Sequence, residues 1–217
     1  MSKIIIFGTT QFSRIIAKHI EDENAGEIVA FCVNERFLEE TELDSKKIVA
    51  FEKLRDLFDM NECSILNTLG YSKMNQTRSK VSYECLDMGY RLYSYISKNA
   101  KVYSKLTGFN NIVMPGAFIG YDVTAGNNNV FYSGCMLTHD ITVGNNNFIA
   151  ANSTFGGNVK IGNNCFIGLN ATVKNQVTLA DKTLVGAGAY VNFNTKEGNV
   201  VVPPRSTILE KTSEQFL

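Results

Sequence analysis

The stretch that decides the fold of this chain is clearest from residue 143 to residue 168, VGNNNFIAANSTFGGNVKIGNNCFIG. Every sixth residue in it is apolar, and the same spacing extends in both directions without a break. The complete set is Val113, Ile119, Ala125, Phe131, Leu137, Val143, Ile149, Phe155, Ile161, Ile167, Val173, Leu179, Val185 and Val191. A period of six fits neither an α-helix, which repeats about every 3.6 residues, nor a single strand, which alternates every second residue.

The spacing fits a chain that turns a corner every six residues and points one apolar side chain inward on each side of a triangle. Three such sides make a coil of about 18 residues, so the stretch predicts a parallel β-helix. Asparagines spaced by one coil fall in register: Asn127 with Asn145 and Asn163, Asn128 with Asn146 and Asn164, and Asn129 with Asn147. Because Asn tolerates the left-handed backbone that a corner needs, we expect these residues to sit at corners and to form ladders of side-chain amides.

The first part of the chain alternates short apolar runs with segments of helical spacing. We predict strands over residues 3–8, 27–33, 47–51, 64–67 and 91–96, and helices over residues 11–20, 52–57 and 75–88. This order indicates a small parallel α/β sheet, in which ligands bind beyond the carboxyl ends of the strands. The turn after the first strand has only the first glycine of a dinucleotide fingerprint, at Gly8. It is either an ordinary strand-to-helix turn or a nucleotide-facing loop. We expect an α/β Rossmann-like domain over residues 1–97 and the β-helix with a C-terminal tail over residues 98–217.

Composition excludes several classes of function. Charge is balanced, with 21 basic and 21 acidic residues, and no basic run suggests a nucleic-acid partner. No apolar run is long enough to insert into a membrane, and the first residues lack the layout of a signal peptide. The five cysteines are not closely paired and predict buried, reduced thiols in a cytoplasmic protein. With two histidines and no CxxC, no metal site is expected.

The repeat resembles that of the hexapeptide-repeat acyltransferases, whose β-helix is left-handed. The resemblance implies that handedness, which the spacing cannot give. A small α/β domain joined to such a β-helix is similar, over nearly the whole chain, to the sialic-acid O-acetyltransferase-like family. That group includes N-acetyltransferases of nucleotide-linked 4-amino-sugars. The likeness is strongest over residues 139–144 and 157–168, and it continues through residues 179–181 and 186–189.

His139 is the histidine of the repeat region, and Asp140 follows it directly. An imidazole can take a proton near neutral pH, as acyl transfer requires, and a neighbouring carboxylate would orient the ring. Gly157 lies one coil further on, so it should stack on His139 and could offer its N–H to an oxyanion. From the residues alone, a hydrogen-bonded surface pair is an equally good interpretation. The resemblance implies the catalytic roles of base, orienting acid and oxyanion donor. His19, on a predicted surface helix, is expected to be solvated.

The resemblance also implies where the substrates bind. Acetyl-CoA would lie between subunits of a homotrimer, against Phe148, Leu169, Ala187 and, at its phosphates, Arg205. Phe148 departs from the family, where a histidine is frequent, and the tail around Arg205 departs too. The sugar nucleotide would bind the α/β domain at Gly8, Thr9, Gln11, Ser13, Asn34, Glu35, Gly70 and Tyr71. The turn at Gly8, the pair Asn34-Glu35 and Tyr132 differ from the usual residues, which leaves the sugar and the nucleotide open.

The expected function is therefore acetyl-CoA-dependent N-acetylation of a nucleotide-linked amino sugar of the 4-amino-4,6-dideoxy type, for surface glycan or O-antigen biosynthesis. Two alternatives stay open. The same scaffold could be an O-acetyltransferase of a sugar or sialic acid, because one base serves both reactions. It could also be a non-catalytic β-helix binding module, although such a module needs neither His139-Asp140 nor Gly157.

Overall fold

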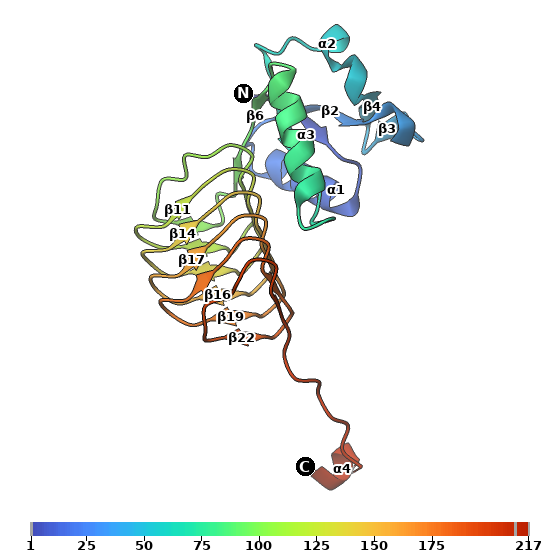
Figure 1. The fold of residues 1–217 in the computed structure, drawn as a ribbon. Helices are drawn as coiled ribbons and strands as arrows, with labels where there is room; N and C mark the ends of the chain where they lie inside the picture. Colours follow the sequence, from blue (N-terminus) through green and yellow to red (C-terminus); the bar gives the residue numbers. More distant parts are fainter. Residues whose placement is uncertain (1, 211, 217) are drawn as a thin grey trace.

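The computed structural model describes residues 2–210 and 212–216. Figure 1 shows an N-terminal α/β domain seated at one end of a coil of short strands, with an extended tail leading from the other end to a short helix, α4 (Ser213–Phe216). The two predicted domain types are therefore present in the predicted order. The position of the boundary between residues 97 and 98 remains a prediction.

The N-terminal domain is a mainly parallel sheet with helices packed on it. The strands lie in the order β3 (Glu42–Leu43), β4 (Lys46–Ala50), β2 (Glu27–Val33), β1 (Lys3–Phe7), β5 (Cys63–Asn67) and β6 (Arg91–Leu92). The helices are α1 (Gln11–Asp22), α2 (Leu54–Leu57) and α3 (Gln76–Asp87), with 3₁₀ turns η1 (Glu35–Phe37) and η2 (Phe51–Lys53). The apolar runs predicted all of these strands except β3, because both faces of a parallel sheet are buried.

Two details of this domain differ from the sequence prediction. The strand expected over residues 91–96 is divided: β6 completes the α/β sheet, whereas β7 (Tyr95–Ile96) pairs with the first coil of the β-helix. The sheet also has an antiparallel edge, since β3 and β4 form a hairpin. Asp44 and Ser45 make its turn with positive φ, a conformation that few residues other than glycine adopt.

The second domain is built from three parallel sheets of two-residue strands. The first sheet holds β7, β9 (Ile112–Val113), β12 (Val130–Phe131), β15 (Phe148–Ile149), β18 (Phe166–Ile167), β21 (Leu184–Val185) and β23 (Val200–Val201). The second holds β8 (Lys101–Val102), β10 (Phe118–Ile119), β13 (Met136–Leu137), β16 (Thr154–Phe155), β19 (Thr172–Val173) and β22 (Tyr190–Val191). The third holds β11 (Thr124–Ala125), β14 (Thr142–Val143), β17 (Lys160–Ile161) and β20 (Thr178–Leu179). From β9 to β22 the paired residues are eighteen apart, for example Phe148 and Phe166, so the predicted coil length is confirmed there. The pairs that involve β7, β8 and β23 have shorter spacings, such as Tyr95 with Ile112 and Leu184 with Val200.

The inside of the β-helix is apolar, as the six-residue period predicts. From β9 to β22 the second residue of each strand points inward, and these residues form one cluster with the apolar residues of the corners. Each fully buried Val, Leu, Ile or Phe side chain stabilises the folded chain by about 1.5–3 kcal/mol. Outward residues differ between faces: those of the third sheet are polar and exposed (Thr124, Thr142, Lys160 and Thr178).

The corners of the coil carry the predicted asparagine ladders. Asn128, Asn146 and Asn164 all have positive φ, between 56° and 61°. In the neighbouring ladder, the N–H of Asn145 donates to Oδ1 of Asn163 at 2.8 Å. A buried ladder follows inside it, where the N–H of Asn147 donates to Oδ1 of Asn129 at 2.9 Å. Both expectations from the Asn register are confirmed.

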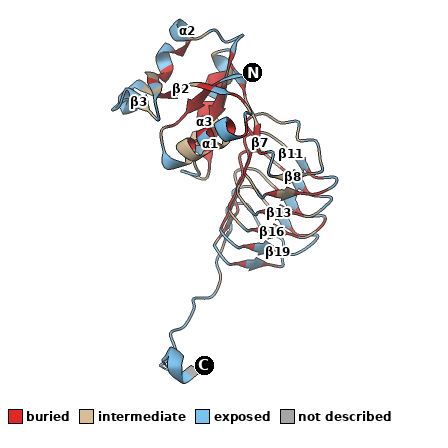
Figure 2. Cartoon of the chain, turned by 180° about the vertical axis from the view of Figure 1, so that it is seen from behind, coloured by how far each residue is buried: buried red, intermediate tan, exposed pale blue. Residues whose placement is uncertain are grey.

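The two domains share one hydrophobic core. Residues of β1, α1 and β2 pack against the outer face of the first sheet, including Ile112, Met114, Val130 and Phe148. Figure 2 shows buried residues continuing through this join. Asn67 at the end of β5 and Asn110 of the first coil exchange two buried hydrogen bonds, of 2.8 and 3.0 Å. The α/β domain therefore covers the N-terminal coils of the β-helix on the face formed by the first sheet.

The five cysteines are all buried and free, as expected. Burial raises the pKa of the Cys135 thiol to about 12 and that of Cys165 to about 11. Within residues 2–210 and 212–216, no helix is both long and apolar enough to cross a membrane.

Candidate active site

His139 and Asp140 lie on the corner between β13 and β14. Asp140 has a positive φ of 53°, as do Asp122, Asn158 and Gln176 at the same position of neighbouring coils. This position favours Asp and Asn because their side chains lower the cost of a left-handed backbone. The imidazole Nδ1 and the Asp140 Oδ2 are 2.7 Å apart. When Nδ1 carries the proton and donates it to the carboxylate, Nε2 is left as a proton acceptor.

Gly157 lies directly against the imidazole, one coil further along the same corner. A Cβ built on Gly157 would come within 2.3 Å of Cε1 and 2.6 Å of Nε2 of His139. Any side chain there would displace the ring, so the predicted stacking of these two residues is present. The Gly157 N–H donates no hydrogen bond to another group in the described part of the chain. A donor without a partner, beside a ring nitrogen that can take a proton, is suited to a developing oxyanion.

The corner that carries His139 and Asp140 is open and faces away from the α/β domain. The side chains of His139 and Asp140 are 58% and 54% exposed. Their corner joins the second and third sheets, whereas the α/β domain packs on the first sheet, the opposite face of the three-sided coil. Within one chain, His139 is therefore separated from any ligand of the α/β domain by the width of the β-helix.

The residues expected to bind acetyl-CoA lie in different surroundings. Leu169 and Ala187 are exposed and stack on the corner between the first and second sheets, where the N–H of Gly188 donates to the Leu169 carbonyl at 2.8 Å. Arg205 is exposed on the tail. Phe148 is buried below the α/β domain, where its ring meets Phe12, Tyr71, Tyr132 and Phe166. Phe148 points outward from the first sheet, but the α/β domain covers that part of the face, and its expected contact with acetyl-CoA remains a prediction.

A cavity of about 490 Å³ opens at the carboxyl ends of β1, β2 and β5. Gly8, Thr9 and Asn34, all expected at the substrate, line it. Gly8 has a φ of +119°, and a Cβ there would approach the Ser13 Oγ to 2.7 Å, so the tight turn requires glycine. The site expected from the sheet topology is thus present as a pocket.

The other expected substrate residues support this pocket from behind or lie beside it. Ser13 is buried and accepts a 2.7 Å hydrogen bond from the Thr68 hydroxyl. Glu35 pairs with Lys53 at 2.8 Å, and Gly70 accepts from Arg78. Gln11 is exposed at the start of α1, and Tyr71 is exposed with its ring edge on Phe148.

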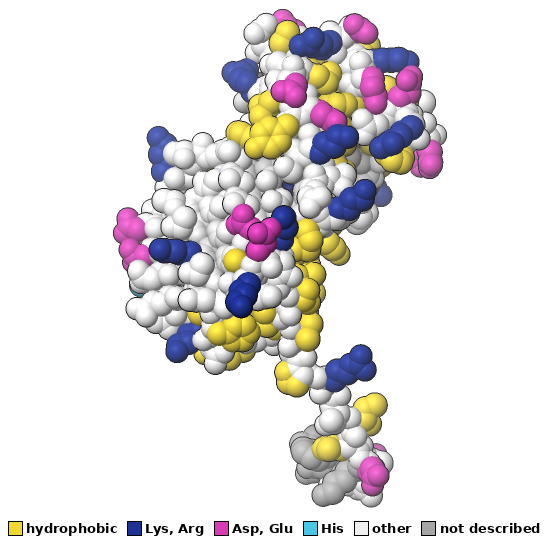
Figure 3. All heavy atoms as spheres, in the orientation of Figure 1, with side chains coloured by type: hydrophobic (Ala, Val, Ile, Leu, Met, Phe, Trp, Pro, Cys, Tyr) yellow, Lys and Arg dark blue, Asp and Glu magenta, His cyan; other side chains and the backbone are white. Residues whose placement is uncertain are grey.

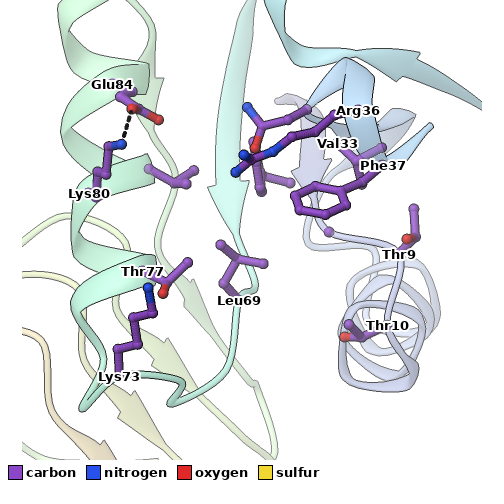
Figure 4. A pocket seen from close by; sticks show the side chains of 14 residues that line it. Thr9, Thr10, Val33, Arg36, Phe37, Leu69, Lys73, Thr77, Lys80 and Glu84 are labelled. Carbon is purple, nitrogen blue, oxygen red and sulfur yellow. Dashed lines mark ion pairs between the residues drawn. The ribbon is translucent and has the colours of Figure 1, made fainter.

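The pocket also contains residues that the sequence analysis did not select. Figure 4 shows Lys73, Thr77, Lys80 and Glu84 on one wall and Arg36 with Phe37 on the other. Residues 77, 80 and 84 recur at helical spacing, so a polar face on the helix after β5 could have been recognised in the sequence, whereas Lys73 lies on the turn before that helix. Arg36 lies over the Phe37 ring at 4.7 Å, and Lys80 pairs with Glu84 at 3.6 Å. The described residues contain no cluster of three His, Cys, Asp or Glu that could hold a metal ion.

Comparisons with known proteins agree with this architecture. Residues 140–175 match the bacterial transferase hexapeptide (six repeats) family. The acetyltransferase domain of PglB from Neisseria gonorrhoeae superposes with a TM-score of 0.83 at 18% identity, covering 94% of this chain and 97% of that domain. PerB from Caulobacter crescentus, solved with CoA and GDP-perosamine, gives 0.82 at 21% identity, covering 94% and 95%. WeeI from Acinetobacter baumannii gives 0.72 at 16% identity, covering 94% and 97%.

At these identities the solved structures establish the fold alone, an α/β domain before a left-handed β-helix of hexapeptide repeats. The PglB domain has also been solved in complex with acetyl-CoA, and that structure superposes on this chain with a TM-score of 0.83 at 17% identity. No curated protein sequence matches the chain significantly.

Proposed function

We propose that this chain is a cytoplasmic, acetyl-CoA-dependent N-acetyltransferase of a nucleotide-linked 4-amino-4,6-dideoxy sugar used for surface glycan or O-antigen synthesis. The observation that carries the proposal is the His139-Asp140 pair stacked on Gly157, whose N–H has no partner in the described residues. A binding module would need none of these three. The pocket at the carboxyl ends of the α/β sheet supplies a separate place for the nucleotide.

The reaction follows from the geometry of the corner. The sugar amine attacks the carbonyl carbon of the thioester while Nε2 of His139 takes the proton that the amine loses. Asp140, bonded to Nδ1, stabilises the imidazolium that forms. The Gly157 N–H donates to the oxyanion of the tetrahedral intermediate. The C–S bond then breaks, the thiolate leaves with the proton from His139, and the amide remains.

A homotrimer would bring the two halves of this site together. Because His139 and the α/β pocket lie on opposite sides of one β-helix, a sugar held in the pocket reaches the His139 of a neighbouring copy. Figure 3 shows hydrophobic side chains gathered on the β-helix below the α/β domain. Exposed apolar residues in this part of the chain include Leu169, Tyr190, Phe193 and Val200. Covering such residues favours assembly, and Leu169 and Ala187 would then face the pantetheine in the groove between copies.

The test is release of free thiol from acetyl-CoA with UDP-, dTDP- and GDP-linked 4-amino sugars and free sialic acid as acceptors. His139→Ala should lower kcat by about 10²–10⁴-fold, the range of a positioned base. His19→Ala is the matched control, because it removes the other histidine, on α1, and should leave activity unchanged. The buried cysteines of the folded chain should add little background.

The outcomes distinguish an N-acetyltransferase from an O-acetyltransferase and from a binding module. Thiol release with one amino sugar, lost in His139→Ala and kept in His19→Ala, would support the proposal and identify the nucleotide. Release with hydroxyl acceptors alone would mean O-acetylation of a sugar or sialic acid. Equal activity of His139→Ala would remove His139 as the base, and no release with any acceptor would favour a binding module.

A further inference from the structure

The turn that leads from β5 into α3 has an unusual backbone. Lys73, Met74 and Asn75 have φ values of 51°, 52° and 65°, so three consecutive non-glycine residues are left-handed. Each costs conformational free energy, and such a run persists only where its surroundings impose it. Strained turns of this kind concentrate at ligand sites.

Arg78 and Asn75 fix this turn onto the β-helix. Arg78 is fully buried, and its Nη1 donates to the Gly70 carbonyl at 2.8 Å and to Oδ1 of Asn75 at 3.1 Å. Its Nη2 donates to the carbonyls of Asn128 and Asn147, at 3.2 and 3.1 Å, on the asparagine corner. Nδ2 of Asn75 donates to the Cys165 carbonyl at 3.0 Å. The turn is thus tied to three successive coils.

Burying the Arg78 side chain to hold this turn has a large desolvation cost. Its partners here are neutral oxygens, and among the described residues no carboxylate forms an ion pair with it. Burial lowers its pKa to about 9. Taking a charge out of water without a counter-ion is unfavourable, so packing alone gives no reason to place Arg78 here.

The turn presents Lys73 to the α/β pocket. Leu69, Lys73 and Thr77 all line the cavity, and in Figure 4 the Lys73 amine lies beside Thr77 on the α3 wall. Of the cations lining the cavity, Lys80 pairs with Glu84 and Arg36 lies on Phe37, whereas Lys73 has no ion pair in the described chain. The Asn75 side chain does not cap α3, so the partial positive charge at the start of that helix adds to the charge of Lys73.

We propose that Lys73 binds the diphosphate of the nucleotide-linked substrate, and that Arg78 and Asn75 are positioning residues that hold it there by locking the left-handed turn onto the β-helix. The inference rests on the proposed function, because it assigns a residue to its acceptor. In this arrangement one strained turn connects the pocket to the asparagine corner of the β-helix.

The experiment measures binding of UDP, dTDP and GDP to the full-length protein by calorimetry, without acetyl-CoA. Lys73→Gln should weaken binding of the preferred nucleotide about tenfold, the loss of one charge-assisted contact. Lys18→Gln, on the exposed part of α1 outside the cavity, is the control and should bind like wild type. Thermal unfolding of each variant checks that it is folded.

Asn75→Gly tests the positioning role without adding strain, because glycine adopts a left-handed backbone freely. It removes both side-chain contacts of Asn75 and should also weaken nucleotide binding. Because Asn75 acts through Lys73, the double variant Lys73→Gln/Asn75→Gly should bind no more weakly than Lys73→Gln alone. A merely structural role would instead give additive losses.

The results separate this inference from the proposed function. Wild-type affinity in Lys73→Gln, or additive losses in the double variant, would overturn the inference and leave the transferase proposal intact. Expected binding changes without any acetyl transfer would support the inference while contradicting the transferase. Failure of the wild type to bind any of the three nucleotides would overturn both the inference and the nucleotide-linked substrate.

Discussion

Asp140 occupies a position where an Asp is favoured for two reasons: the left-handed backbone of the corner and the hydrogen bond to His139. The corner needs a left-handed residue, and the neighbouring coils meet that need with Asp122, Asn158 and Gln176. An Asp at this place is therefore not by itself a sign of catalysis. The signal lies in the combination with His139, whose Nδ1 is 2.7 Å from the carboxylate, and with Gly157 below the ring.

Gly157→Ala should strongly reduce the proposed acetyl transfer without unfolding the protein. Gly157 does not have positive φ, so its backbone accepts alanine. The new Cβ would fall within 2.3–3.0 Å of three imidazole atoms, which forces His139 out of its position. We expect kcat to fall about 10²-fold, the contribution of a placed base, while the N–H at residue 157 is kept. Acetyl transfer and thermal unfolding, measured on the same preparation, check this.

Asn175→Ala is the matched control for that variant. Asn175 is exposed at the same corner position one coil further on, so truncating it should change neither activity nor stability. Full activity of Gly157→Ala would mean that the imidazole need not lie where the structure has it.

The register of the repeat was enough to predict His139, Asp140 and Gly157 as one group, because an eighteen-residue spacing fixes which residues stack. It was not enough for Phe148. The period says that Phe148 points outward, but whether solvent, a ligand or another domain covers it depends on where the α/β domain docks. Lys73 was missed for a similar reason, since it stands on a turn whose conformation is imposed by Arg78 contacts from distant coils.

At the scale of elements, the coils are joined by amide ladders as well as by apolar packing. In the buried ladder, Asn147 accepts from the Cys165 N–H at 2.7 Å and donates to the Gly162 carbonyl at 2.9 Å. The two-residue strands provide few ladder bonds of their own, so these side chains satisfy backbone groups that the corners leave open.

Asn147→Ala should therefore destabilise the β-helix. It leaves a buried N–H and a buried carbonyl without those partners, a loss of about 2–4 kcal/mol in the free energy of unfolding. The measurement is urea unfolding, in which the midpoint should fall. Thr178→Ala, on the exposed third sheet, should change stability by less than about 0.5 kcal/mol. Equal midpoints for the two variants would show that the ladder contributes nothing.

The elements that the sequence predicted best were those with the strongest period. The strands of the β-helix and β1, β2 and β5 appear where the apolar pattern has them, give or take a residue. The hairpin of β3 and β4 was missed because its turn, Asp44-Ser45, has no glycine to mark it. The division of residues 91–96 between two sheets was not predicted either, because no Gly or Pro interrupts this segment to mark the end of one strand and the start of the next.

At the scale of the whole molecule, one chain contains both halves of the proposed site but keeps them apart. The first sheet carries the α/β domain, and His139 stands on the corner opposite that sheet. The homotrimer proposed above would bring the corner of each copy to the pocket of the next. Light scattering should then give a mass of three chains.

Two inactive variants should restore each other if the site is shared. His139→Ala removes the base, and Thr77→Trp fills the pocket from α3, where Thr77 lines the cavity. In trimers formed by equal co-expression, a site that joins the His139 of one copy to the pocket of the next is intact with a probability of one in four. We therefore expect about a quarter of wild-type acetyl transfer from the co-expressed pair, and almost none from either variant alone. A site within one chain would leave every copy defective, so trimers without activity would assign the corner and the pocket to the same chain. Co-expression of His139→Ala with Gly157→Ala is the control: both defects lie on the corner, and no mixture restores it.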